Sequence, residues 1–195
     1  LCLFAAAVAT LTLWTSVRRF AVPVLPAALV AGALSASTPL AAYGSQVYPE
    51  IVGALATVAA VAALTGPLRR GGLAVLAIAV VALPWLAVKY APVAVVLALL
   101  GVWRLWRTGR PQAAAGLAAG LAAAAVAFLV VHEALYGGTT PYAAGSYFVD
   151  GQLQVIGNDP DYLGRSRRLV GLIVDRDFGI AAWQPAWLAL VPALG

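Results

Sequence analysis

The scarce charged side chains of this chain form groups able to hold an anion. Lys89 lies in the stretch PWLAVKY, residues 84–90, directly before Tyr90. A lysine ammonium is a compact charge that can bind a phosphate, and the alternative is a snorkelling lysine with its stem in lipid and its head in water. Arg165 and Arg168 are three residues apart, so on a helix they would share one face and could grip a phosphate together. These residue types favour an anion site, with internal ion pairs and lipid headgroup contacts as the alternatives.

Further along the same stretch, Asp175 and Arg176 come just before the last apolar run. Residues 161–179 are the densest charged region of the chain. They add to the charge that could bind a phosphate. The spacing alone does not separate this hypothesis from a set of ion pairs at the lipid surface.

Glu50 directly follows Pro49 and precedes a long apolar run. If a helix begins here, the proline fits its first turn and the carboxylate complements the positive end of the helix dipole. Alternatively, Glu50 faces a cavity with Tyr43 and Tyr48 and accepts hydrogen bonds from a sugar. Both interpretations are compatible with the sequence.

His132 and Glu133 adjoin each other at the end of another apolar run, and His132 is the sole histidine. Neighbouring helical residues point in different directions, so we predict no metal site from this pair. His132 is then either an interfacial cap or a hydrogen-bond partner of a substrate.

The composition predicts the setting in which these groups lie. The chain has 195 residues, of which 63% are hydrophobic and 10% charged, a balance typical of membrane proteins. A helix needs about 20 apolar residues to cross a bilayer, and apolar runs recur along the chain. The lone Cys2 excludes an internal disulfide, and the absence of methionine together with apolar ends indicates a fragment of a longer chain. The apolar runs cover residues 1–17, 20–36, 51–66, 73–83, 91–103, 113–131 and 179–194.

Arginines mark three short connections between these runs. If the runs alternate across a membrane, all three connections lie on one side, which the positive-inside rule makes cytoplasmic. The net charge of +5 therefore reports orientation and does not predict nucleic-acid binding. The arginines are Arg18 and Arg19, then Arg69 and Arg70, then Arg104, Arg107 and Arg110.

The short runs 73–83 and 91–103 are predicted to form a hairpin whose apex is LPWLAVKYAP, residues 83–92, because Pro84 and Pro92 interrupt helical hydrogen bonding. Irregular backbone at membrane depth survives where protein or water surrounds it, so we expect the apex to line a cavity. The predicted fold is all-α: one polytopic transmembrane helical bundle over residues 1–195, with about six or seven membrane segments, this broken-helix hairpin, and a long extracytoplasmic loop at 132–178.

Three motifs carry a family resemblance. The stretches YGSQVYPEI at 43–51, LPWLAVKYAP at 83–92 and PDYLGRSRRLVGLIVDRDFGIAAWQPAW at 160–187 resemble bacterial polytopic membrane glycosyltransferases of the GT-C class. These are relatives of protein O-mannosyltransferases and of the lipid A aminoarabinose transferase. The resemblance spans roughly residues 38–190. It implies a helical bundle that takes a sugar from a polyprenyl phosphate donor and transfers it on the extracytoplasmic face of the bacterial plasma membrane.

The resemblance also implies roles for particular residues. Glu50 matches the family's carboxylate after a Tyr-Pro pair, and Lys89 matches its lysine in the broken-helix motif. The principal acidic base of the family would precede Leu1, and Ala87 stands where the family has a polar residue, which weakens any assignment of metal use. No cofactor is predicted, and a divalent metal is left open. The later polar motif of the family falls on Arg165, Arg168, Asp175 and Arg176. The resemblance thus places Arg176 with the phosphate-binding residues, and Asp175 and Tyr90 with those that orient a sugar or support the cations.

The sequence therefore predicts an integral membrane glycosyltransferase whose partners are a polyprenyl-phosphate-linked sugar donor and membrane lipids, with the base missing from this chain. One alternative is a transporter or lipid flippase, in which the same charges would line a translocation path. Another is a structural membrane subunit without a site of its own. A transporter favours ionisable residues near the bilayer midplane, whereas the candidates here fall near one boundary.

Overall fold

The computed structural model describes residues 2–36, 41, 48–139, 148–149, 152–153, 170–171 and 174. The chain divides into two units, Leu1–Pro141 and Tyr142–Gly195. The first unit contains the helices α1 (Cys2–Arg19), α2 (Val24–Ala36), α4 (Glu50–Thr65), α5 (Arg70–Leu86), α6 (Ala91–Arg107) and α7 (Pro111–Tyr136), and the short 3₁₀ helix η1 (Val88–Tyr90). The predicted helical bundle is confirmed for this unit.

In the second unit, two short antiparallel strands lie within the stretch 132–178 predicted to be a long loop. Strand β1 is Phe148–Val149 and strand β2 is Gln152–Leu153. Phe148 pairs with Leu153, and Val149 pairs with Gln152. These pairs make a small two-stranded antiparallel sheet.

Prolines and glycines set the ends of the helices. Pro111 opens α7, where a missing N–H costs nothing because the first amides of a helix have no internal partner. Gly137 ends the same helix in the left-handed conformation, with φ of 69°, and its N–H donates to the Glu133 carbonyl at 2.9 Å. Helix α7 thus extends into the first residues of the predicted 132–178 loop.

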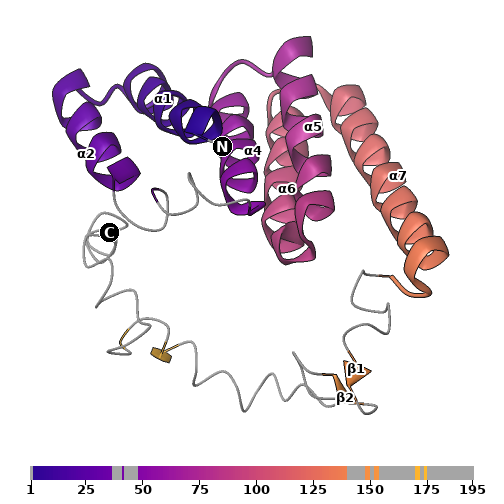
Figure 1. Ribbon diagram of the computed structural model, residues 1–195. Helices are drawn as coiled ribbons and strands as arrows, with labels where there is room; N and C mark the ends of the chain where they lie inside the picture. Colours follow the sequence, from indigo (N-terminus) through magenta and orange to yellow (C-terminus); the bar gives the residue numbers. More distant parts are fainter. Residues whose placement is uncertain are drawn as a thin grey trace. The chain divides into compact units, whose positions relative to one another are not determined.

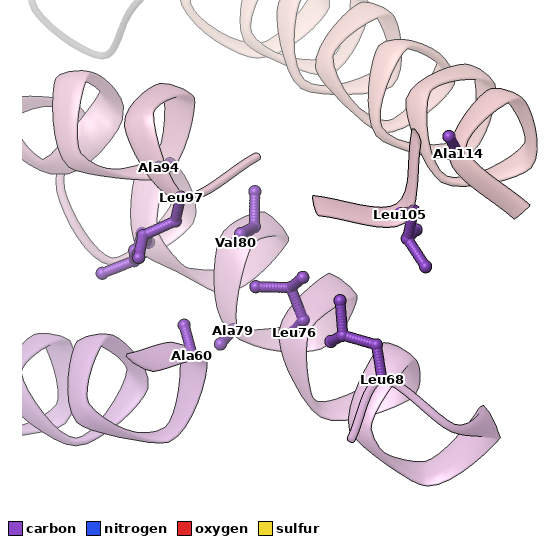
Figure 2. Close-up of a cluster of buried hydrophobic side chains, with 10 residues drawn as sticks. Ala60, Leu68, Leu76, Ala79, Val80, Ala94, Leu97, Leu105 and Ala114 are labelled. Carbon is purple, nitrogen blue, oxygen red and sulfur yellow. The ribbon is translucent and has the colours of Figure 1, made fainter. Parts of the chain in front are cut away.

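Helices α5 and α6 lie side by side between α4 and α7 (Figure 1). Where they meet, Leu76, Leu83 and Leu105 are fully buried, and small residues such as Ala60 and Ala94 allow the helix backbones to approach closely. Figure 2 shows this cluster, with side chains from neighbouring helices pointing toward one another. The core of the unit is therefore built around the α5–α6 pair.

Two glycines of this bundle are expected to respond oppositely to substitution. A Cβ at Gly101 would lie 2.7 Å from Leu76 Cδ2, whereas a Cβ at Gly120 would meet nothing within 4 Å. Gly101→Ala should therefore destabilise the protein by about 1–3 kcal/mol, because the fully buried Leu76 side chain would have to shift within the packed core. Gly120→Ala should stabilise it by about 0.5–1 kcal/mol, because alanine favours the helix. Thermal unfolding in detergent checks the pair, and equal shifts would contradict this packing.

The arginine-rich connections gather at one end of the bundle, as predicted from the alternation of apolar runs. The Arg19 guanidinium lies against Gly66 at the end of α4, where a Cβ would be 2.5 Å from Nη2. Arg110, ahead of α7, donates through Nη1 to the Leu68 carbonyl, in the α4–α5 connection, at 2.5 Å. We call this end, with Arg18, Arg19, Arg69, Arg70, Arg104, Arg107 and Arg110, the arginine end.

Two helical stretches are long and apolar enough to cross a membrane, Val88–Arg107 and Pro111–Tyr136. The other apolar helices in the described ranges are shorter: Val24–Ala36, Glu50–Thr65 and Arg70–Leu86. Large apolar side chains are exposed on both long helices, including Leu99 and Val130, which suits contact with lipid. The structure thus supports association with a membrane, while six or seven crossings stay a prediction.

Candidate functional site

The hairpin predicted at residues 83–92 is confirmed, and its apex is a break between α5 and α6. Ala87 is extended, with φ of −166° and ψ of 140°, so the helix stops there although its N–H still donates to the Leu83 carbonyl at 3.2 Å. Pro84 lies in the last turn of α5, and Pro92 lies at the start of α6. The single turn of η1 between them carries Lys89 at the end of the bundle opposite the arginine end.

The apex is joined to α4 by an ion pair. Lys89 Nζ lies 2.5 Å from Glu50 Oε1, although the two residues are 39 apart in the chain. The lysine side chain is 54% exposed and the glutamate side chain 21%. The second carboxylate oxygen, Oε2, is buried and accepts no hydrogen bond within the part of the chain that the structure describes. The two candidates that the sequence placed on one face are thus in direct contact.

Tyr90 also contributes to the contact between the apex and α4. Its ring lies on Gly53 of α4, where an added Cβ would be 3.0 Å from Cε2 and Cζ. The Lys89 ammonium is 5.4 Å from the centroid of this ring, within the range of a cation–π contact. Glycine at position 53 therefore lets the apex approach α4 closely enough for the ion pair to form. Tyr48, two residues before Glu50, is exposed.

The geometry supports the interpretation of Glu50 as a helix-terminal carboxylate, while the cavity shared with Tyr43 involves a residue outside the described part of the chain and stays a prediction. Glu50 is the first residue of α4, after Pro49, and the Gly53 N–H donates to the Pro49 carbonyl at 2.8 Å. It thus complements the helix dipole. The Glu50 side chain also points to the apex and pairs with Lys89, so Glu50 does more than complement the helix dipole.

The ion pair makes stability depend on pH in the acidic range. The hydrogen bond from Lys89 lowers the pKa of Glu50, which precedes the apolar run of α4, below its ordinary value of 4.5. A lowered pKa in the folded state contributes stability above the ordinary value, and this contribution is lost as the pH falls through the folded-state pKa. We expect Glu50→Gln to lower the melting temperature at pH 7, with the difference from wild type shrinking below pH 4.5.

The measurement is thermal unfolding of both proteins in one detergent across this pH range. Because Lys89 is half exposed, solvent screening keeps the expected effect small. Glu133→Gln, which neutralises an exposed carboxylate in the last turn of α7, is the control. A constant difference between Glu50→Gln and wild type at every pH would contradict the assignment of the titration to Glu50.

His132 belongs to an aromatic cluster between α5 and α7. Its side chain is buried, with 6% exposed, and its Nδ1 lies 2.8 Å from the Phe128 carbonyl. A carbonyl only accepts, so Nδ1 donates and Nε2 is the ring atom left to contact another group. The ring centroid lies 3.9 Å from that of Phe128, 5.3 Å from that of Trp85 and 5.4 Å from that of Tyr136.

An apolar groove of about 370 Å³ runs from this cluster along α5, α6 and α7. Val88 of η1 lines it, directly before Lys89 in the chain, so the expectation that the apex lines a cavity is met. The groove lies on the α7 side of the hairpin, whereas Lys89 reaches to α4. Its lining includes Val80, Pro84, Trp85, Val88, Leu121 and Phe128.

Other candidate residues cannot be placed. Tyr43, Arg165, Arg168, Asp175 and Arg176 lie outside the described residues, so their predicted roles stay predictions. Within the described ranges there is no group of three side chains of the types that bind metal ions. The structure therefore brings together Glu50, Lys89 and Tyr90 at one side of the apex, and places His132 at the other.

Sequence reasoning missed the aromatic cluster although a signal for it was present. Phe128, His132 and Tyr136 follow one another at intervals of four, so they share one face of a helix. Trp85 completes the cluster from α5, in an edge-to-face arrangement with Phe128 at 5.2 Å between centroids. This partner comes from tertiary packing and has no counterpart in the local pattern.

Comparison with known protein families, with curated proteins and with solved structures found no match.

Proposed function

We propose that this chain is part of a membrane-embedded glycosyltransferase that takes a sugar from a polyprenyl phosphate donor. The observation that carries the proposal is the half-exposed Lys89 held by Glu50 at a break between two apolar helices. A cation fixed at the end of a helical bundle is suited to hold the phosphate of a lipid-linked donor at the membrane surface. The motif resemblance at residues 43–51 and 83–92 points to the same class.

The reaction requires little chemistry from Lys89 itself. An acceptor hydroxyl oxygen attacks the anomeric carbon, the bond from that carbon to the phosphate oxygen breaks, and polyprenyl phosphate leaves with the electron pair. The acceptor proton passes to a general base. Lys89 stabilises the negative charge that develops on the leaving phosphate, because a preorganised cation gains most where charge increases in the transition state.

Glu50 has two roles in this proposal. Through Oε1 it holds the ammonium in place, and through the buried Oε2 it is able to accept a hydrogen bond from a sugar hydroxyl. Unsatisfied buried acceptors are costly, so a ligand hydroxyl at Oε2 would gain a strong partner. Tyr48 and Tyr43 keep their predicted supporting roles.

The groove between α5, α6 and α7 supplies a place for the isoprenoid chain. Its lining is apolar throughout the α5 and α7 faces, and Val88 brings it to the residue next to Lys89. A donor lying over the apex would have its chain on the α7 side and its phosphate on the α4 side. The aromatic cluster around His132 then lies at the point where the chain meets the headgroup.

The position of the charges along the helices favours transfer at a membrane surface over transport. Glu50 begins α4, Lys89 lies between α5 and α6, and His132 lies near the end of α7, so all three are at helix ends. A translocation path would place ionisable groups near helix centres. With the arginine end cytoplasmic by the positive-inside rule, the site faces the extracytoplasmic side of a bacterial plasma membrane.

The test is transfer of a radiolabelled sugar from polyprenyl phosphate by the full-length protein in proteoliposomes. We expect labelled acceptor and free polyprenyl phosphate to appear in equal amounts, because each transfer releases one lipid phosphate. Movement of the intact donor between leaflets without release of polyprenyl phosphate would overturn the proposal in favour of a flippase. A mixture of donors with different sugars identifies the substrate.

A further inference from the structure

The arginine end carries a concentration of positive charge that the proposed transfer reaction does not use. Contacts draw its three connections together: Arg19 lies against Gly66, and Arg110 donates to the Leu68 carbonyl. Arg69 and Arg70 follow Leu68 directly and are exposed. The ends of α1, α4 and α6 and the starts of α5 and α7 thus share one cationic surface.

No counter-charge accompanies these arginines in the described part of the chain. The carboxylates described there are Glu50, the first residue of α4, and Glu133, in the last turn of α7, both at the opposite ends of their helices. The ion pair between Lys89 and Glu50 is likewise at that other end. An anion bound from outside the bundle would relieve the repulsion among these arginines.

Helix dipoles explain some of these arginines but not all. Arg104 and Arg107 lie in the last turn of α6, where cations are favoured. Arg69 and Arg70 instead precede and open α5, where the helix dipole already presents positive charge and no acidic residue occupies the first turn. Among the described residues no carboxylate neutralises these two exposed arginines at a positive helix end, which favours an anionic ligand.

Tryptophans at the same end indicate what kind of ligand it is. Trp14, Trp103 and Trp106 are exposed, and Arg19 and Arg107 lie over the rings of Trp14 and Trp103 at 4.9 and 5.8 Å from their centroids. Exposed indoles beside basic residues at the end of apolar helices are typical of the headgroup level of a bilayer. A soluble anion would not account for these exposed indoles.

We propose that the arginine end binds the phosphates of anionic phospholipids, with Arg69 and Arg70 as its principal contacts. The guanidinium groups bind the phosphodiester oxygens, and the tryptophans lie among the headgroups beside them. This inference rests on the membrane setting of the proposed function but not on sugar transfer. It predicts a preference for anionic over zwitterionic lipid around the protein.

The test uses the full-length protein in nanodiscs and the quenching of its tryptophans by brominated phosphatidylglycerol or brominated phosphatidylcholine. We expect phosphatidylglycerol to bind wild type about tenfold more tightly, a preference that two juxtamembrane arginines are able to supply. Arg69→Gln/Arg70→Gln should lose most of this preference, and Arg69→Lys/Arg70→Lys should keep most of it because the charge is retained.

Equal quenching of wild type by the two lipids would overturn the inference, as would an unchanged preference in the glutamine variant. Salt provides a second measurement on wild type that does not depend on a variant's folding. Raising the ionic strength should reduce the preference, since screening weakens exposed charge contacts. A preference that is insensitive to salt also counts against the arginines. Since no arm measures transfer, the outcome is independent of the glycosyltransferase assignment.

Discussion

Lys89→Ala lowers the rate of sugar transfer by about a hundredfold or more, the effect expected when a preorganised charge at a developing anion is removed. The lysine is placed at the apex by the break at Ala87 and is held there by Glu50 at 2.5 Å. Without it, the departing phosphate loses the cation that the apex supplies. The measurement is initial velocity with labelled donor in proteoliposomes, with kcat and KM determined separately.

Two further variants make this result specific. Lys89→Arg keeps the charge and should recover a large part of kcat, which a purely structural role for the lysine would not require. Glu133→Gln removes an exposed charge near the end of α7 and should leave transfer unchanged. A Lys89→Ala enzyme with wild-type kcat would remove Lys89 from the phosphate site, whatever its effect on KM.

Leu97→Ala is expected to destabilise the bundle by about 2–4 kcal/mol, the range for deleting a buried leucine side chain that leaves a cavity. Leu97 is 5% exposed and belongs to the core cluster with Leu76 and Val80, as Figure 2 shows. In lipid the change in solvation is small, so the lost packing contacts dominate the effect. Unfolding by a denaturing detergent gives the free energy.

Leu99 supplies the matched control on the same helix. It is two residues further along α6 and is 64% exposed. Leu99→Ala should change stability by less than about 0.5 kcal/mol, as for other surface substitutions. If the two variants unfolded alike, the packing of α6 against α5 described here would be wrong.

The local features of the bundle could be predicted from sequence because they depend on neighbouring residues. Pro84 and Pro92 marked the hairpin, and its apex lies between them as expected. The run predicted to start at residue 20 begins as a helix at Val24, since Ala21 takes a φ of 54° and Pro23 follows. Such differences are small and have local causes.

Contacts between distant residues could not be predicted in the same way. The sequence placed Glu50 and Lys89 on one face, but their pairing depends on how α4 packs beside the hairpin. That packing in turn requires a glycine at position 53, because the Tyr90 ring occupies the space of a Cβ there. No local sequence pattern predicts this contact. Likewise, Trp85 joins Phe128 and His132 only because α5 and α7 are neighbours in space.

The pairing of Glu50 with Lys89 bears on how the chain is inserted into the bilayer. In the proposed orientation both side chains must traverse the hydrocarbon layer to reach the outer side, and a lone charge at its centre costs roughly 2.5–3.5 kcal/mol. If α4 and the following hairpin cross together, the carboxylate and the ammonium travel as a neutral unit. Insertion of α4 into the membrane during synthesis is then coupled to insertion of the hairpin. A nascent chain without Glu50 would have to move the Lys89 ammonium across the hydrocarbon layer with no neutralising carboxylate.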